Sequence, residues 1–215
     1  FRRMHKRRFV MNSRRLLVAS GEQRVTHVVF RHGWIAYTIQ CERLKSWHVC
    51  AASTNASCAR PVTSVMSSRD PSRCGAIVSS PVGLSIAADA TLAVALDLDG
   101  VHLYQLDCAD DGAASASPRH VLRPKRGKSG LPIVKGIGWL AHPHDALSLV
   151  VFFADEYHGR EVIQVFGEVG VGGQCKRTRV LHAEIGSIQQ FTTHDPGRIA
   201  LVVGSQRQLH LFVRR

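Results

Sequence analysis

The sequence predicts an all-β protein built from repeated antiparallel units, and three observations lead to this prediction. Apolar segments of similar design recur at intervals of 51 to 56 residues, anchored at Phe30, Ile86, Leu140 and Phe191. Short runs rich in Val, Leu, Ile and aromatic residues alternate with turn residues, as in half-buried strands. No stretch of about twelve residues combines capping residues with the apolar spacing of an amphipathic helix.

Each unit begins with a predicted hairpin. The anchor residue closes one apolar run, and a polar turn leads to a second run in which Val, Leu, Ile and aromatic residues dominate. These second runs are residues 34–40, 91–96, 147–153 and 198–203. Their composition suits a pleated strand that buries at least one face.

A third run with cleaner alternation follows, and its turn is clearest at Asp99-Gly100. Two-residue hairpin turns favour positive φ, which glycine adopts at low cost, so Asp-Gly between alternating apolar runs is a strong hairpin signal. In the run at residues 101–106, the odd-numbered side chains are expected on one face and the even-numbered ones on the other. The corresponding third runs are residues 161–166 and 209–213.

Shorter segments supply candidates for a fourth strand, at residues 76–79, 120–122 and 179–182. The expected four-stranded antiparallel units therefore cover approximately residues 16–80, 81–123, 131–182 and 183–215, after a basic N-terminal arm at residues 1–15. Two stretches rich in polar and small residues interrupt the units, and we expect both to be surface loop insertions. They are residues 53–80 and 109–130.

The order of these elements resembles the WD-repeat family of β-propellers. The resemblance is carried by residues 91–107 (TLAVALDLDGVHLYQLD), which are similar to that family's strand, Asp-Gly turn, strand and terminal Asp, and by residues 181–213, which have its order of elements. Leu106-Asp107 stands where the family has Trp-Asp, and the family's Gly-His dipeptide is missing. The resemblance implies a β-propeller of four-stranded antiparallel blades. Four blades are few for that family, so a partial or open ring is expected.

Positive charge is concentrated in two segments. Lys and Arg number 28 against 16 Asp and Glu, which gives a net charge of +12. Candidate contacts to phosphate or nucleic acid are the basic residues before the first carboxylate, Glu22, and those of a second cluster: Arg2, Arg3, Lys6, Arg7, Arg8, Arg14, Arg15, Arg123, Lys125, Arg126 and Lys128. Such side chains bind a phosphate backbone by releasing its counterions. The simpler interpretation of both clusters is a solvated basic surface.

No motif predicts a catalytic, cofactor-binding or metal site. Lys128-Ser129 ends a segment similar to a phosphate-binding loop, but Leu122 stands where that motif needs its first glycine. The sequence His142-Pro143-His144-Asp145 is better explained as a turn than as a metal site. Asp97 and Asp99 form a close pair of carboxylates on one strand face next to a turn, and we expect both to be solvated. The six cysteines lack Cys-x-x-Cys spacing and are expected to be free thiols.

These features predict a non-catalytic scaffold subunit of a larger intracellular complex, with other protein subunits as partners and no cofactor or small-molecule substrate. One alternative is a ribonucleoprotein component that contacts RNA phosphates through the basic segments, and another is an all-β enzyme with an unrecognised site. No apolar run reaches the roughly 18 to 20 residues of a membrane-spanning helix, so no membrane contact is expected. A nuclear or cytoplasmic location is expected, and the Arg-rich, acid-free N-terminus is also compatible with a mitochondrial presequence.

Overall fold

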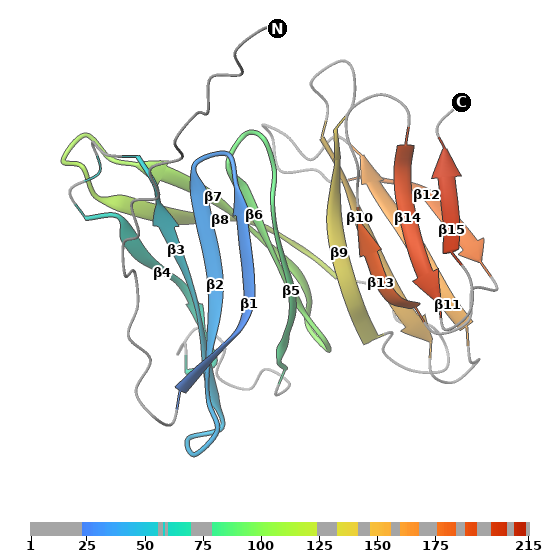
Figure 1. The fold of residues 1–215 in the computed structure, drawn as a ribbon, viewed down its shortest axis with the longest axis horizontal. Helices are drawn as coiled ribbons and strands as arrows, with labels where there is room; N and C mark the ends of the chain where they lie inside the picture. The colour runs from blue at the N-terminus through green and yellow to red at the C-terminus, as the bar shows by residue number, and fades with distance from the viewer. Residues whose placement is uncertain are drawn as a thin grey trace, which may run out of the picture.

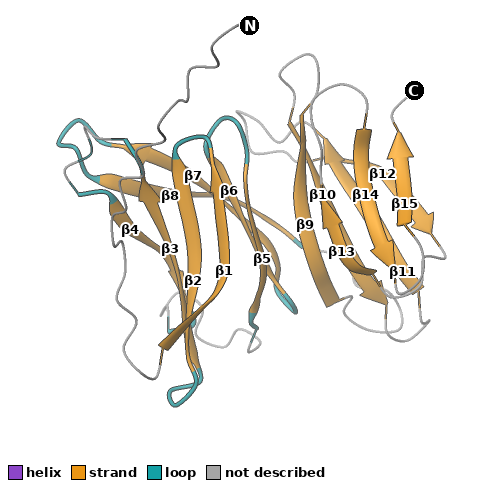
Figure 2. Cartoon of the chain, in the orientation of Figure 1, coloured by secondary structure: helices purple, strands orange, loops and turns teal. Residues whose placement is uncertain are grey.

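The described part of the chain is made of β-strands joined by turns (Figures 1 and 2). The computed structural model describes residues 23–55, 58, 60–69, 79–123, 133–141, 147–155, 160–167, 176–183, 188–192, 199–205 and 209–213. Every regular element in these ranges is a strand, which confirms the all-β prediction. None of the described residues belongs to a helix long and apolar enough to cross a membrane.

The strands form four antiparallel sheets, each built from strands that are consecutive in the sequence. The first sheet contains β1 (Gln23–Arg31), β2 (Trp34–Cys41), β3 (Ser46–Ser53) and β4 (Val62–Ser67). The second contains β5 (Pro81–Ile86), β6 (Thr91–Leu96), β7 (Gly100–Cys108) and β8 (Ala114–Leu122). The third contains β9 (Ile133–Ala141), β10 (Leu147–Asp155), β11 (Arg160–Gly167) and β12 (Lys176–Ala183). The fourth contains β13 (Ile188–Thr192), β14 (Ile199–Ser205) and β15 (Leu209–Val213).

Successive sheets contact each other through their first strands. β1 lies against β5, β5 against β9, and β9 against β13. The first and second sheets also contact at their far edges, because β4 lies against β8. The second sheet is therefore enclosed between the first and the third (Figure 1).

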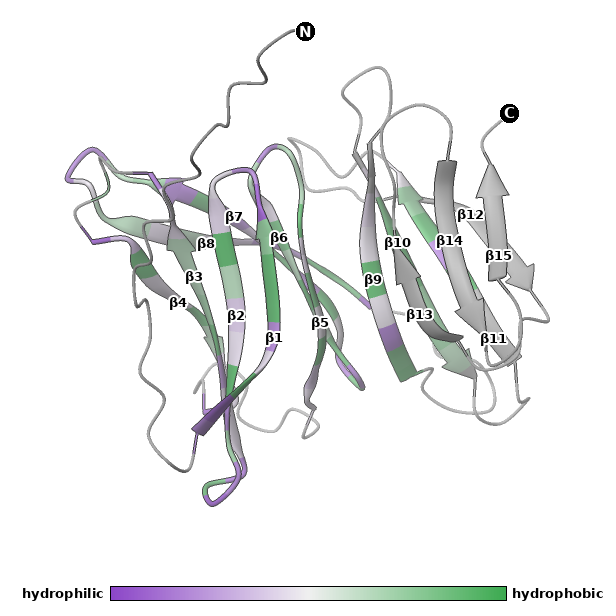
Figure 3. Cartoon of the chain, in the orientation of Figure 1, coloured by the Kyte–Doolittle hydropathy of each residue, from purple (hydrophilic) through white to green (hydrophobic). Residues whose placement is uncertain are grey.

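The second sheet is buried on both faces, and β6 lies at its centre. The even-numbered side chains of β6 belong to an apolar cluster with Trp34 and Trp47 of the first sheet. Its odd-numbered residues Ala93 and Ala95 belong to a second cluster, which includes Trp139 of the third sheet. All six residues of β6 are buried. Hydrophobic positions lie along the strands and hydrophilic ones concentrate in the turns, as expected of packed sheets (Figure 3).

Several local predictions are confirmed. The strands β2, β6, β10 and β14 match the predicted second runs to within two residues at each end. The alternation predicted for β7 is also present. Val101 and Leu103 face the third sheet, whereas Tyr104 and Leu106 face the first.

Both stretches expected to be loops contain strands, so that expectation is wrong for part of each. β4 lies within residues 53–80 and pairs with β3, because its Val and Thr residues suit a strand despite the polar sequence around them. It is the fourth strand of the first sheet, in place of the predicted residues 76–79, of which 76–78 lie outside the described residues. β8 lies within residues 109–130 and pairs with β7. Its Pro118 is compatible with a strand because β8 is at the edge of the sheet.

The predicted Asp99-Gly100 turn is present between β6 and β7. Gly100 has a φ of +90°, and a Cβ added there would overlap the carbonyl oxygen of Leu122. Gly33, in the turn between β1 and β2, has a similar φ of +77°, but the nearest atom to an added Cβ is Thr54 Oγ1 at 3.7 Å. The two glycines share the left-handed conformation and differ in the space around them.

This difference predicts unequal effects of two alanine substitutions. We expect Gly33→Ala to lower the free energy of unfolding by about 1 kcal/mol, because only the positive φ is unfavourable. Gly100→Ala should lower it by a further 1–3 kcal/mol or so, because the added methyl group displaces backbone of β8. Urea denaturation of both variants measures the difference. Equal losses of stability would show that β7 and β8 do not approach as closely as described.

Candidate interaction surface

The first sheet has one face against the second sheet and an opposite face, here called the outer face. The cross-strand register aligns the residues of the outer face in three rows: Phe30, Ile35, Ala52 and Val62; Val28, Tyr37, Cys50 and Ser64; and Val25, Ile39, His48 and Ser67. Their neighbours Val29, Ala36 and Ala51 belong to the cluster between the first and second sheets. Because successive side chains of a strand point to opposite faces, these rows point away from the second sheet.

Large apolar side chains on this face are exposed to solvent. Val28 and Phe30 are 66% and 64% exposed, and Val25 and Val62 are also exposed. Single exposed apolar residues are common on soluble proteins, whereas a group of them on one face marks a contact surface. Phe30 begins a row of apolar residues that crosses all four strands. The outer face is therefore the described surface with the clearest character of a binding site.

The outer face can be compared with the faces buried between sheets. The second strand of each following sheet turns apolar residues toward the preceding sheet: Leu92, Val94 and Leu96 in β6, and Leu149, Val151 and Phe153 in β10. β6 turns the smaller Ala93 and Ala95 toward the following sheet. β2 places Trp34 and Ala36 toward the second sheet, and Ile35, Tyr37 and Ile39 on the outer face. The outer face therefore presents three bulky side chains of β2, in the positions from which β6 and β10 contact a preceding sheet.

Tyr37 lies in the middle row of the outer face. Its side chain is only 5% exposed and lies beside the thiol of its cross-strand partner Cys50. Burial raises the pKa of Tyr37, and the neighbouring Cys50 thiol adds to this effect. Because Tyr37 is buried, the exposed part of the outer face consists of the side chains around it, above all Val28 and Phe30.

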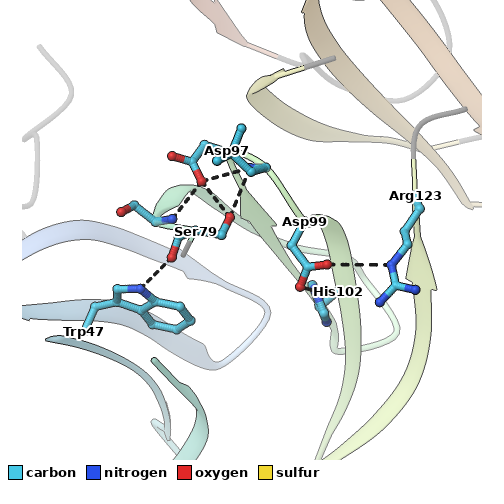
Figure 4. Close-up of polar contacts among 8 residues, drawn as sticks. Trp47, Ser79, Asp97, Asp99, His102 and Arg123 are labelled. Atoms are coloured by element: carbon cyan, nitrogen blue, oxygen red, sulfur yellow. Dashed lines mark hydrogen bonds and ion pairs between the residues drawn. The ribbon is translucent and has the colours of Figure 1, made fainter. Parts of the chain in front are cut away.

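A separate polar network joins the first and second sheets (Figure 4). Asp97 Oδ1 accepts hydrogen bonds from Ser79 Oγ at 2.6 Å, from Ser80 N at 2.7 Å and from Leu98 N at 2.8 Å. The carbonyl oxygen of Ser79 accepts a hydrogen bond from Trp47 Nε1 at 2.8 Å. In serine hydrolases of the Ser-His-Asp type the nucleophilic hydroxyl donates to a histidine, whereas the Ser79 hydroxyl donates to the Asp97 carboxylate. The network therefore has the geometry of a structural link.

The second carboxylate at this turn, Asp99, lies close to two basic side chains. Asp99 Oδ2 lies 3.1 Å from His102 Nε2, and Asp99 Oδ1 lies 3.6 Å from Arg123 Nε. The side chain of Asp99 is only 16% exposed. The expectation that Asp97 and Asp99 are solvated is therefore wrong. Asp97 accepts hydrogen bonds from Ser79 and Ser80, and Asp99 pairs with His102 and Arg123.

Only one of the predicted phosphate contacts lies in the described part of the chain. The Arg123 side chain is 71% exposed, and its pairing with Asp99 offsets part of its charge. The other predicted contacts lie outside the described residues: Arg2, Arg3, Lys6, Arg7, Arg8, Arg14, Arg15, Lys125, Arg126 and Lys128. The predicted His142–Asp145 turn lies outside them as well. Within the described ranges, no group of three or more His, Cys, Asp or Glu side chains could hold a metal ion.

Comparison with known proteins adds no relative. The sequence matches no protein-family model and no curated protein. The candidate surface therefore rests on the geometry and exposure of its own residues.

The polar network predicts that Asp97 stabilises the fold. We expect Asp97→Ala to lower the free energy of unfolding by about 2–3 kcal/mol, because it removes a charged acceptor that binds two backbone amides and a hydroxyl. Asp110→Ala is the matched control, since this exposed carboxylate in the turn before β8 should change stability by less than about 0.5 kcal/mol. Chemical denaturation of the two variants tests this, and similar effects at both positions would contradict the role assigned to Asp97.

Proposed function

We propose that this chain is a non-catalytic scaffold that binds other protein subunits in a larger intracellular complex, built on propeller blades similar to WD repeats. The observation that carries the proposal is the group of exposed apolar side chains on the outer face of the first sheet, Val25, Val28, Phe30 and Val62. A surface of this kind is unfavourable in water unless a partner covers it.

The arrangement of the sheets supports propeller blades. A propeller consists of four-stranded antiparallel sheets repeated radially around a central axis. Here the strands of each sheet follow one another in sequence, and the first strands β1, β5, β9 and β13 contact one another in turn. In a radial arrangement, the first strand of each sheet lies nearest the central axis and contacts the first strands of the neighbouring sheets.

The partner that best fits the outer face is a β-sheet of another protein subunit. The bulky residues of β2 on this face correspond to those that β6 and β10 pack against a preceding sheet.

Charge substitutions on the outer face test the proposal. We expect the double variant Val28→Lys, Phe30→Lys to recover at least about tenfold less of the protein partners that copurify with the wild-type chain from its native cells, because two desolvated charges oppose binding. Quantitative mass spectrometry of the purified complexes measures the loss. Leu44→Lys is the matched control, because Leu44 is 55% exposed in the turn between β2 and β3, away from the outer face.

Two results would contradict the proposal. Equal recovery of partners by the double variant and the wild type would show that the outer face is not the binding surface. A wild-type chain that copurifies with no protein at all would remove the scaffold function itself. Both variants should unfold within about 0.5 kcal/mol of the wild type, since the substituted side chains are exposed.

A further inference from the structure

Two cysteines from different sheets meet beside the turn between β7 and β8. Cys58 belongs to the connection between β3 and β4 of the first sheet, and Cys108 ends β7 of the second sheet. Both are free thiols; Cys58 is buried and Cys108 is half-buried. They are 50 positions apart in the sequence, so the fold and not the local chain brings them together.

The backbone around the two cysteines is held by hydrogen bonds between the sheets. Arg60 and Ala113 form a parallel bridge, in which Arg60 N donates to Gly112 O at 3.0 Å and Ala114 N donates to Arg60 O at 2.9 Å. Ala114 is also the cross-strand partner of Cys108. The Cys58 thiol donates to the same Gly112 carbonyl, at 3.1 Å. Both cysteines therefore lie beside the same β-bridge.

The Cys108 thiol also influences Cys58. The pKa of Cys58 is raised, chiefly by the neighbouring Cys108 side chain and then by burial. Cys50 is in a different environment, because its thiol lies beside Tyr37 on the outer face. Cys58 therefore has a second thiol as its neighbour, whereas the neighbour of Cys50 is a tyrosine hydroxyl.

We propose that Cys58 and Cys108 form a reversible disulfide when the chain meets a low-molecular-weight disulfide such as oxidised glutathione, and that this bond locks the first sheet to the second. The proposal does not depend on the scaffold function, because Cys58 and Cys108 are not part of the outer face.

The reaction proceeds by two exchanges. The more accessible Cys108 thiolate attacks one sulfur of oxidised glutathione, which forms a mixed disulfide and releases one glutathione thiolate. The Cys58 sulfur then attacks the Cys108 sulfur and releases the second glutathione. The two protons of the cysteine thiols pass to the two glutathione thiolates. One protein dithiol and one oxidised glutathione thus give one protein disulfide and two reduced glutathiones.

The bond would stabilise the native chain mainly by restricting the unfolded chain. A link between residues 50 positions apart removes much of the conformational freedom of the segment between them. Because the bridge at Arg60 and Ala113 already orders this region, little native structure has to move. We expect oxidation to raise the thermal unfolding midpoint of the intact chain by about 5–10 °C.

Peptide mapping of the native chain tests the proposal. The chain is equilibrated with mixtures of reduced and oxidised glutathione, free thiols are alkylated, and the unreduced peptides are identified by mass spectrometry. A peptide pair linked through Cys58 and Cys108 should become the main intramolecular disulfide and disappear on reduction. Cys41 and Cys50 should remain alkylated thiols.

Three variants provide controls. Cys58→Ser and Cys108→Ser should each remove the oxidant-dependent rise in the unfolding midpoint, whereas Cys50→Ser should retain it. The mapping of the wild-type chain does not require any variant to fold. Separate alkylation or glutathionylation of Cys58 and Cys108 at every glutathione ratio, or a main disulfide between other cysteines, would overturn the proposal.

Discussion

The burial of β6 on both faces is the constraint on which the rest of this structure depends. Its six residues lose nearly all contact with solvent, and their sizes alternate. Leu92, Val94 and Leu96 meet the first sheet, whereas Ala93 and Ala95 leave room for the aromatic side chains of the third. The third sheet approaches closely enough that a Cβ on Gly83 would lie 3.5 Å from Ile137 Cγ1. One short strand thus sets the spacing of three sheets.

Polar contacts at the end of β6 complete this arrangement. The Asp97 carboxylate binds Ser79, whose carbonyl oxygen binds Trp47 of the first sheet. The Asp97 carbonyl oxygen accepts a hydrogen bond at 2.8 Å from Val134 N of the third sheet. Apolar packing thus brings the sheets together, and Asp97 links all three at one turn. The same alternation produces the outer face of the first sheet. Each of its strands buries one set of side chains against the second sheet and turns the other set away from it.

Local features of the fold could be predicted from the sequence, because they depend on near neighbours. Apolar composition predicted β6, alternating apolar residues predicted β7, and the need for positive φ predicted the turn at Gly100. β4 was missed, and only residues 120–122 of β8 were predicted, because the polar and small residues of these strands become strands only through pairing with β3 and β7. The composition of each segment alone does not contain this information.

The candidate site could not be predicted in the same way. Phe30 and Ile86 occupy equivalent places in the repeat, yet Phe30 is 64% exposed and Ile86 is 0% exposed. The difference arises from which sheet lies between two others, and no local pattern records that. The proximity of Cys58 and Cys108 to one bridge is similarly non-local, with no spacing motif to mark it. Exposure and non-local contacts are properties of the assembled sheets.

Hydrogen exchange of the native chain, resolved by residue, tests the central role of β6 most directly. If the second sheet is the enclosed core, the amides of β6 should exchange slowest, through global unfolding alone, and those of the edge strand β1 should exchange much faster. Exchange of β6 at the rate of β1 would contradict an enclosed second sheet, and with it the origin proposed for the outer face.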